Sequence, residues 1–355
     1  MAGSKRREKL EKEKRRRKKL EARRAAQPAH RSIAEQASRL IEDGEWGEAR
    51  EILEAYDRAH APRSDVLKLL LDVCHEQEDM GGICSAAGRL LKIEPDNPPL
   101  HLMFASACMC EARPASALLG FRRYVERWPD DPLAAGVRDS IAELEPLVEE
   151  LLREAPFPAK QRLELAALHE ETLAALGSGN YERCIEAGER LLARCPAFIN
   201  VRNNLSQAYF LLGRTEQALA ASRAVLRQQP NNPHALANLA RHLLLLGQNE
   251  EAQAACQRLR EVETDNPDIW SKKAETFAFF GDDEAVLETF AAAEQAGHLR
   301  EKSPDVALLY HLAAVALARQ GNHRQARKHW QSALQLAPGF ELAEENLADS
   351  RKPVG

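Results

Sequence analysis

The sequence predicts an all-α protein built from a repeated helical unit, and three features indicate this fold class. Aromatic residues make up only 5% of the 355 residues, so few residues favour strands. Gly213, Gly247 and Gly281 follow one another at intervals of 34 residues. Between them, apolar residues recur every three or four positions, which is the spacing of one helix face. A fixed period of this length predicts a solenoid in which each unit packs on the next.

Each period contains the signals for two helices, as the segment 199–232 shows. The first apolar stripe consists of Leu205, Ala208, Tyr209 and Leu212, and the second consists of Ala218, Leu219, Ser222, Val225 and Leu226. Gly213 lies between the stripes, where a positive φ can close the first helix. Pro230 lacks the amide that would continue the second helix. We therefore expect a helix–turn–helix unit.

These residues resemble the tetratricopeptide repeat family, whose 34-residue unit combines a central glycine with small packing residues and a closing proline. The unit that begins at Ile199 matches this pattern with Leu205, Ser206, Tyr209, Gly213, Ala218 and Pro230, and further units begin at Pro233, Pro267 and Ala307. The resemblance implies a right-handed α-solenoid. Earlier units match less well, because Gln77 and Ala112 stand near helix ends where glycine is expected.

The repeat pattern divides the chain into five segments. We expect a basic arm at 1–29, three divergent repeats at 30–131, a degenerate helical spacer at 132–164, four repeats at 165–338, and a capping helix with a tail at 339–355. In the spacer, Pro146 and the run APFP at 155–158 interrupt the helical pattern, so the array is expected to bend or hinge there.

No set of residues in the sequence has the spacing of a catalytic or cofactor site, so we expect no enzyme, cofactor or metal. Cys108 and Cys110, with Cys74 and Cys84 nearby, would suggest a metal site, but residues two apart on a helix point in nearly opposite directions. The seven cysteines are therefore interpreted as reduced core thiols. The mean hydropathy of −0.47 argues against a membrane span, and the basic N-terminus has no apolar stretch behind it, as a signal peptide would. Together with reduced thiols, this predicts a cytoplasmic protein, or a nuclear one in a eukaryote.

The family resemblance implies that binding takes place in a concave groove lined by the first helix of each unit. Candidate groove residues are Asn200, Asn203, Asn204, Gln207, Phe210, His234, Asn238, Arg241 and Lys272, with Leu244, Leu245 and Phe279 as further apolar anchors. Amide side chains both donate and accept hydrogen bonds, so they suit the main chain of an extended peptide. The alternative is that the asparagines stand by chance on an exposed polar helix face, or that they bridge one helix to the next. Arg241 and Lys272 suit an acidic side chain or a terminal carboxylate.

The net charge of −5 conceals a basic N-terminal arm. Residues 1–24 carry a balance of +9, and the rest of the chain carries −14. Arg15, Arg16, Arg17, Lys18 and Lys19 are the candidate residues for contact with RNA, the ribosome, an anionic lipid or an acidic protein. The alternative is a solubilising tail. The sequence thus predicts a non-catalytic adaptor that binds peptide segments of other proteins, with an RNA- or ribosome-associated factor as the alternative function.

Overall fold

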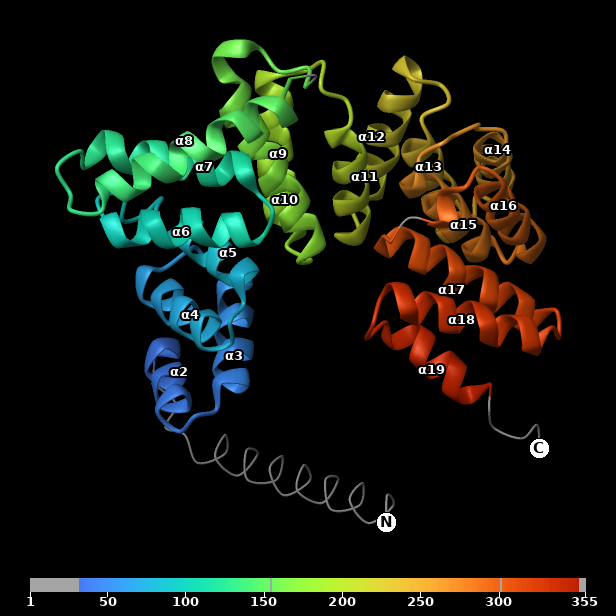
Figure 1. Cartoon of the computed structure of the whole chain (residues 1–355), viewed down its shortest axis with the longest axis horizontal. Coiled ribbons are helices and arrows are strands. Elements are labelled where there is room, and N and C mark those ends of the chain that lie inside the picture. The colour runs from blue at the N-terminus through green and yellow to red at the C-terminus, as the bar shows by residue number, and fades with distance from the viewer. Residues whose placement is uncertain (1–31, 154, 301, 351–355) are drawn as a thin grey trace. The chain divides into compact units, whose positions relative to one another are not determined.

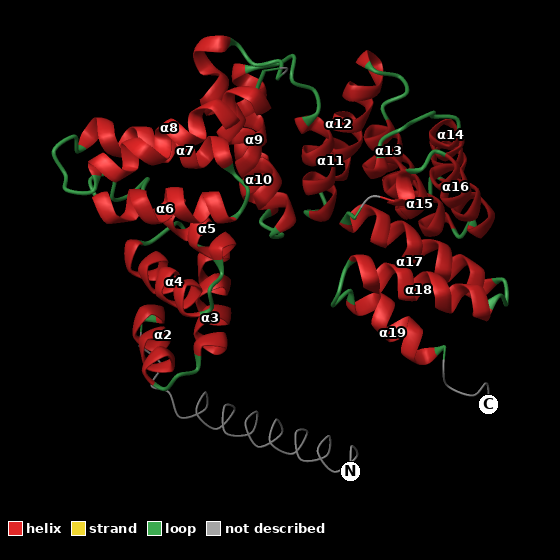
Figure 2. Ribbon diagram, viewed as in Figure 1, coloured by secondary structure: helices red, strands yellow, loops and turns green. Residues whose placement is uncertain are grey.

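The computed structural model describes residues 32–153, 155–300 and 302–350. Across these residues the chain forms helices joined by loops and contains no strand (Figure 2), which confirms the predicted fold class. The chain divides into two compact units, at residues 1–155 and 156–355, and each is described by itself.

The first unit is a row of antiparallel helices in which each helix packs on the next along the chain (Figure 1). Its helices are α2 (Ile33–Glu42), α3 (Trp46–Ala59), α4 (Ser64–Glu76), α5 (Met80–Leu90), α6 (Pro98–Cys110), α7 (Pro114–Arg127) and α8 (Ala134–Leu151). The pairs α2–α3, α4–α5 and α6–α7 are the predicted helix–turn–helix units. Helix α8 packs on α7.

One turn geometry joins the two helices of every repeat. At this turn Gly213 has φ 72°, and the amide of Arg214 donates to the carbonyl of Tyr209 at 2.8 Å. This bond satisfies a carbonyl at the end of the first helix. In the three divergent repeats the left-handed residues are Gly44 (φ 74°), Glu78 (φ 54°) and Ala112 (φ 51°), so two of them are not glycine. The residue at the glycine position is therefore Glu78, whereas the sequence suggested Gln77. A residue with a side chain is strained in this backbone conformation, which glycine adopts freely.

Helix α8 runs through Pro146 without ending, which differs from the interruption expected at this residue. Proline removes one amide from the helix, so the carbonyl of Ala142 loses its usual partner. Leu144 and Val148, on either side of the proline, are both buried. Packing of this apolar face offsets the loss of a single hydrogen bond, and the helix ends at Leu151, before the run APFP.

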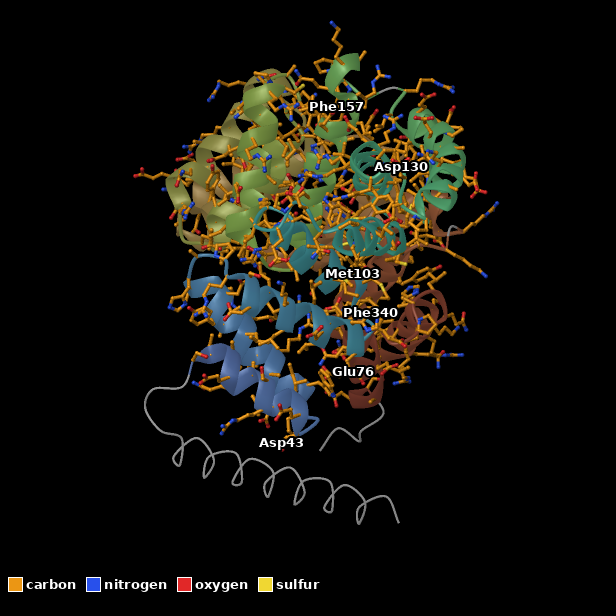
Figure 3. All side chains as sticks on the ribbon, turned by 90° about the vertical axis from the view of Figure 1, so that its left-hand side faces the viewer. Asp43, Glu76, Met103, Asp130, Phe157 and Phe340 are labelled. Carbon is orange, nitrogen blue, oxygen red and sulfur yellow. The ribbon has the colours of Figure 1, made fainter. Side chains whose placement is uncertain are left out.

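The second unit continues the alternation of helices. It contains η1 (Ala159–Gln161), α9 (Arg162–Gly177), α10 (Tyr181–Arg194), α11 (Val201–Leu211), α12 (Thr215–Gln228), α13 (Pro233–Leu245), α14 (Asn249–Arg260), α15 (Pro267–Phe280), α16 (Asp283–Gln295), η2 (His298–Arg300), α17 (Pro304–Arg319), α18 (His323–Leu336) and α19 (Glu341–Asp349). Phe340, labelled in Figure 3, precedes α19 and lies 5.0 Å from the ring of His311. Helix α19 packs on α18 and buries Ala343 and Leu347, so it covers the end of the array.

The first helices of successive repeats also contact one another. Helix α11 packs on both α9 and α13, and α15 packs on both α13 and α17. The second helices instead pack on the first helices beside them. We call the side of this unit lined by α9, α11, α13, α15 and α17 the first-helix face. It is a continuous surface because its helices are in direct contact.

Small residues allow neighbouring helices to approach closely. Ser206 on α11 donates to the carbonyl of Ala218 on α12 at 2.9 Å and lies 2.7 Å from the hydroxyl of Ser222, and all three side chains are fully buried. Gly188 on α10 lies against α11, where an added Cβ would be 2.8 Å from Leu205 and 3.3 Å from Val201. The helices are therefore packed without space for an additional methyl group at this contact.

We predict that Gly188→Ala destabilises the second unit. The new methyl group would overlap buried Leu205, and overpacking of this kind costs about 1–3 kcal/mol. Gly177→Ala is the matched control, because an added Cβ there meets nothing within 4 Å. Thermal unfolding followed by circular dichroism should show a lower Tm for Gly188→Ala and an equal or higher Tm for Gly177→Ala. Equal Tm values for Gly188→Ala and the parent chain would contradict this packing.

We also predict that residues 156–355 fold when expressed alone. The contacts of the chain separate into two units at this boundary, and each repeat packs mainly on its neighbours. The fragment should give a helical circular dichroism spectrum and a cooperative thermal transition. A soluble but unfolded fragment, or one that unfolds without a transition, would show that the second unit depends on the first.

Candidate functional site

Residues that occupy the same position in neighbouring repeats lie next to each other on the first-helix face. His234 on α13 and Asp268 on α15 are 34 residues apart, and their Nε2 and Oδ2 atoms are separated by 3.4 Å. Arg241 and Glu275 have the same spacing, with 3.5 Å between Nη1 and Oε2. Each position of the repeat therefore forms a row across the face.

One such row is apolar and exposed. Leu211, Leu245 and Phe279 lie in the last turns of α11, α13 and α15, again 34 residues apart, and their exposed fractions are 50%, 59% and 40%. The guanidinium of Arg241 lies over the ring of Phe279 at 5.3 Å from its centroid. The apolar row therefore borders the row formed by Gln207, Arg241 and Glu275. Leu245 and Phe279 were expected from the sequence, whereas Leu211 was not, although it lies 34 residues before Leu245.

Two of the candidate asparagines lie in the contact between first helices. Asn238 on α13 donates through Nδ2 to the backbone carbonyl of Asn203 on α11 at 2.9 Å. Asn203 in turn donates through Nδ2 to Oδ1 of Asn232 at 3.3 Å. Asn203 is 7% exposed and Asn238 is 9% exposed. These two amides therefore bridge neighbouring helices, which was one alternative interpretation of the candidate asparagines.

The other candidate amides are more accessible to solvent. Asn200, at the start of α11, and Gln207 are exposed, and Asn204 is half-buried. The side chain of Asn200 makes no capping hydrogen bond to α11. The structure thus separates the amide candidates into a buried pair, Asn203 and Asn238, and three residues that solvent reaches.

Phe210 packs against a buried histidine that the sequence analysis did not identify. The ring of Phe210 on α11 stacks on His242 of α13, with 4.0 Å between centroids and an angle of 4° between planes. Burial, together with the positive charge of Arg241, lowers the pKa of His242 to about 4, so its ring is neutral near pH 7. Nδ1 of His242 is buried and has no hydrogen-bond partner within the described part of the chain. Phe210 therefore contributes part of its ring to the contact between repeats.

The candidate cations already have carboxylate neighbours. Lys272 Nζ lies 2.9 Å from Oε2 of Glu275, the same oxygen that Arg241 approaches. His234 is close to Asp268, but burial has the largest effect on the pKa of His234 and lowers it. Burial, followed by the charge of Asp268, raises the pKa of Asp305 on the adjacent helix α17. Carboxylates of α15 thus lie beside the candidate cations of α13 and α15, and a further carboxylate, Asp305, follows on α17.

Other candidates can be placed only in part. Arg15, Arg16, Arg17, Lys18 and Lys19 lie outside the described residues, so contact with a polyanion stays a prediction from charge. On α6, Cys108 is buried and Cys110 is exposed, as their spacing on a helix requires. Within residues 32–153, 155–300 and 302–350, no group of three potential ligands is arranged to hold a metal ion. In those same ranges, no helix has the length and apolar character needed to span a membrane.

Known structures with helical repeats are similar to this chain at low sequence identity. A thermophilic TPR protein from Thermus thermophilus is 17% identical, with 52% of this chain and 98% of that chain covered and a TM-score of 0.42. A tetratricopeptide repeat protein from Parabacteroides merdae is 12% identical over 90% of this chain and 98% of that chain, with a TM-score of 0.36. YrrB, described as a TPR protein with an unusual peptide-binding site, is 20% identical, covering 49% of this chain and 87% of that chain, with a TM-score of 0.33.

No curated protein sequence matches the chain significantly. Three family models described as tetratricopeptide repeat do match it, at residues 200–224, 213–275 and 307–340. These matches cover α11 to α14, the first turns of α15, and α17 with α18. They confirm the resemblance inferred from the 34-residue spacing: the matched residues are tetratricopeptide repeats.

Proposed function

We propose that the protein is a non-catalytic adaptor that binds a peptide segment of another protein on the first-helix face, across α11, α13 and α15. The observation that carries this proposal is the exposed apolar row of Leu211, Leu245 and Phe279. Three large apolar side chains at equivalent positions are costly to leave in water, and burial by a ligand removes this cost. Polar neighbours on the same face provide the specific contacts that an apolar row lacks.

The spacing of the row suits an extended peptide. Packed helices lie about 8–10 Å apart, so neighbouring side chains of the row have a similar separation. An extended polyproline-type segment advances about 9 Å every three residues. A ligand with apolar side chains about three residues apart would therefore meet Leu211, Leu245 and Phe279 in turn. Asn200, Asn204 and Gln207 would then bond to its main chain, since amides donate and accept.

The charges on the face favour a ligand of low net charge. Glu275 lies against both Arg241 and Lys272, and Asp268 lies against His234. An acidic peptide would have to displace these carboxylates or tolerate their repulsion. We therefore propose an apolar, nearly uncharged segment as the ligand, in place of the acidic ligand that Arg241 and Lys272 alone suggest.

We predict that replacing the apolar row weakens binding without loss of stability. The double variant Leu211→Ser and Leu245→Ser removes two exposed anchors, each worth on the order of 1–2 kcal/mol when buried by a ligand. Affinity capture from a cell lysate, with the bound proteins identified by mass spectrometry, should lose at least one partner that the parent chain retains. Leu342→Ser is the matched control, because Leu342 is 55% exposed on α19 and lies off this face.

The affinity of a captured partner should then fall at least tenfold for the double variant and remain unchanged for Leu342→Ser. Identical capture by the parent chain and both variants would refute binding on this row. A large fall in the Tm of the double variant would instead show that the leucines are structural.

A second prediction separates the amides that bridge repeats from those that face the ligand. Asn238→Ala removes a buried donor to the carbonyl of Asn203, so it should lower stability by about 1–3 kcal/mol. Asn204→Ala with Gln207→Ala should weaken partner binding while the Tm stays near that of the parent chain. If the Asn204→Ala and Gln207→Ala variant lost as much stability as Asn238→Ala, all of these amides would have a structural role.

A further inference from the structure

Two buried cysteines of the first unit are in direct contact. Cys84 lies on α5, the second helix of one repeat, and Cys108 lies on α6, the first helix of the next. The Sγ atom of Cys84 donates to that of Cys108 at 3.3 Å. Their exposed fractions are 1% and 0%. The two thiols therefore meet at the interface between neighbouring repeats, 24 residues apart along the chain.

The turn after α6 brings a buried cation to this pair. Ala112 adopts the left-handed conformation, and the amide of Arg113 donates to the carbonyl of Cys108 at 2.8 Å. The side chain of Arg113 is 9% exposed. Its Nη2 is 3.4 Å from the hydroxyl of Ser116, whereas its Nε is buried without a partner among the described residues. The guanidinium charge is thus held close to the thiols and is incompletely satisfied by hydrogen bonds.

This environment acts on Cys84 differently from the surroundings of two other buried thiols, Cys74 and Cys184. Burial raises the pKa of Cys74 to about 11 and the pKa of Cys184 to about 12, because it disfavours the thiolate. For Cys84 the hydrogen bond with Cys108 is the largest effect and lowers the pKa, against the effect of burial. The charge of Arg113 lowers it further. A cation beside a thiol favours the nucleophilic thiolate form.

We propose that Cys84 and Cys108 form an oxidative modification site, at which a hydroperoxide converts the two thiols into a disulfide that links neighbouring repeats. The proposal rests on the contact between the sulfurs, on their position at the interface and on the buried guanidinium beside them. A disulfide requires the sulfurs to approach to about 2.05 Å, a displacement small enough for side-chain and slight helix adjustment.

The reaction balances with the hydroperoxide as the sole oxidant. The thiolate of Cys84 attacks an oxygen of the peroxide, so an S–O bond forms and the O–O bond breaks. The leaving group, which is hydroxide when the oxidant is hydrogen peroxide, takes up a proton. The thiolate of Cys108 then attacks the sulfur of the resulting sulfenic acid. An S–S bond forms, the S–O bond breaks and water leaves. The two thiols lose two electrons in total, and hydrogen peroxide is reduced to two molecules of water.

The bond would join two repeats that are otherwise held by packing. Stability in a solenoid depends on the interfaces between neighbouring units, so a covalent link between α5 and α6 would restrict opening at this interface. Cys110, although exposed, lies on the opposite side of α6 from Cys108. Within the described chain, Cys84 and Cys108 are the thiols for which a hydrogen bond between sulfur atoms is found.

The test uses the full-length protein and hydrogen peroxide. After treatment, the chain is denatured, its free thiols are alkylated, and its peptides are mapped by mass spectrometry without reduction. We expect two fewer alkylated thiols than the seven of the untreated chain and a cross-linked peptide pair containing Cys84 and Cys108. Dithiothreitol should restore both thiols. The same treatment in urea should not select this pair, because unfolding separates the sulfurs.

Variants identify the roles of the individual groups. Cys84→Ala and Cys108→Ala should each abolish the cross-link to the remaining partner, whereas Cys74→Ala, at a thiol that is equally buried, should retain it. Arg113→Gln should slow disulfide formation several-fold, and Arg113→Lys, which keeps the charge, should restore most of the rate. Circular dichroism monitors the folding of each variant. If a variant does not fold, the peptide mapping of the peroxide-treated chain without substitutions decides the proposal.

Two results would overturn the proposal. The first is that all seven thiols remain free after peroxide treatment of the folded chain. The second is that a disulfide forms but links other cysteines, or forms equally well in urea, since either outcome would show that the contact between Cys84 and Cys108 does not direct the oxidation.

Discussion

The hydrogen bond that closes the turn within each repeat is the constraint on which the rest of the structure depends. One residue adopts a left-handed conformation, and the next amide bonds to a carbonyl of the preceding helix, as in Gly213 with Arg214 and Ala112 with Arg113. Because the same bond recurs, the same turn joins the two helices of each repeat. Equivalent positions of successive repeats are thereby aligned, which places His234 beside Asp268 and Arg241 beside Glu275. The rows on the first-helix face follow from this repetition.

The contacts between repeats use polar as well as apolar groups. Ser206 and Ser222 fill a space that would not admit larger side chains, and they satisfy each other's hydroxyl groups. Asn238 bonds to the backbone of the neighbouring first helix, and the buried ring of His242 stacks on Phe210. Buried polar groups are stable only with their partners in place. They therefore favour one register of neighbouring helices over others that would bury the same apolar area.

The same alignment determines which groups remain for a ligand. Pairing with Glu275 occupies Arg241 and Lys272, and burial removes Asn203 and Asn238 from the surface. Leu211, Leu245 and Phe279, in the last turns of the first helices, stay exposed. In the first unit, alignment of α5 and α6 brings Cys84 to Cys108, and the turn after α6 positions Arg113 beside them.

The sequence by itself determined the helical fold class, the 34-residue period and the family, because glycine, proline and small residues act locally and recur at fixed positions. It also identified Leu245 and Phe279 as apolar anchors. Only the tertiary structure decided that Asn203 and Asn238 bridge helices while Asn204 and Gln207 face solvent, since neighbouring residues of one helix differ in what the next helix covers. Three further features likewise cannot be read from composition and spacing. The left-handed residue at Glu78 depends on backbone conformation. The pairing of Lys272 with Glu275 and the contact of Cys84 with Cys108 depend on distances between side chains.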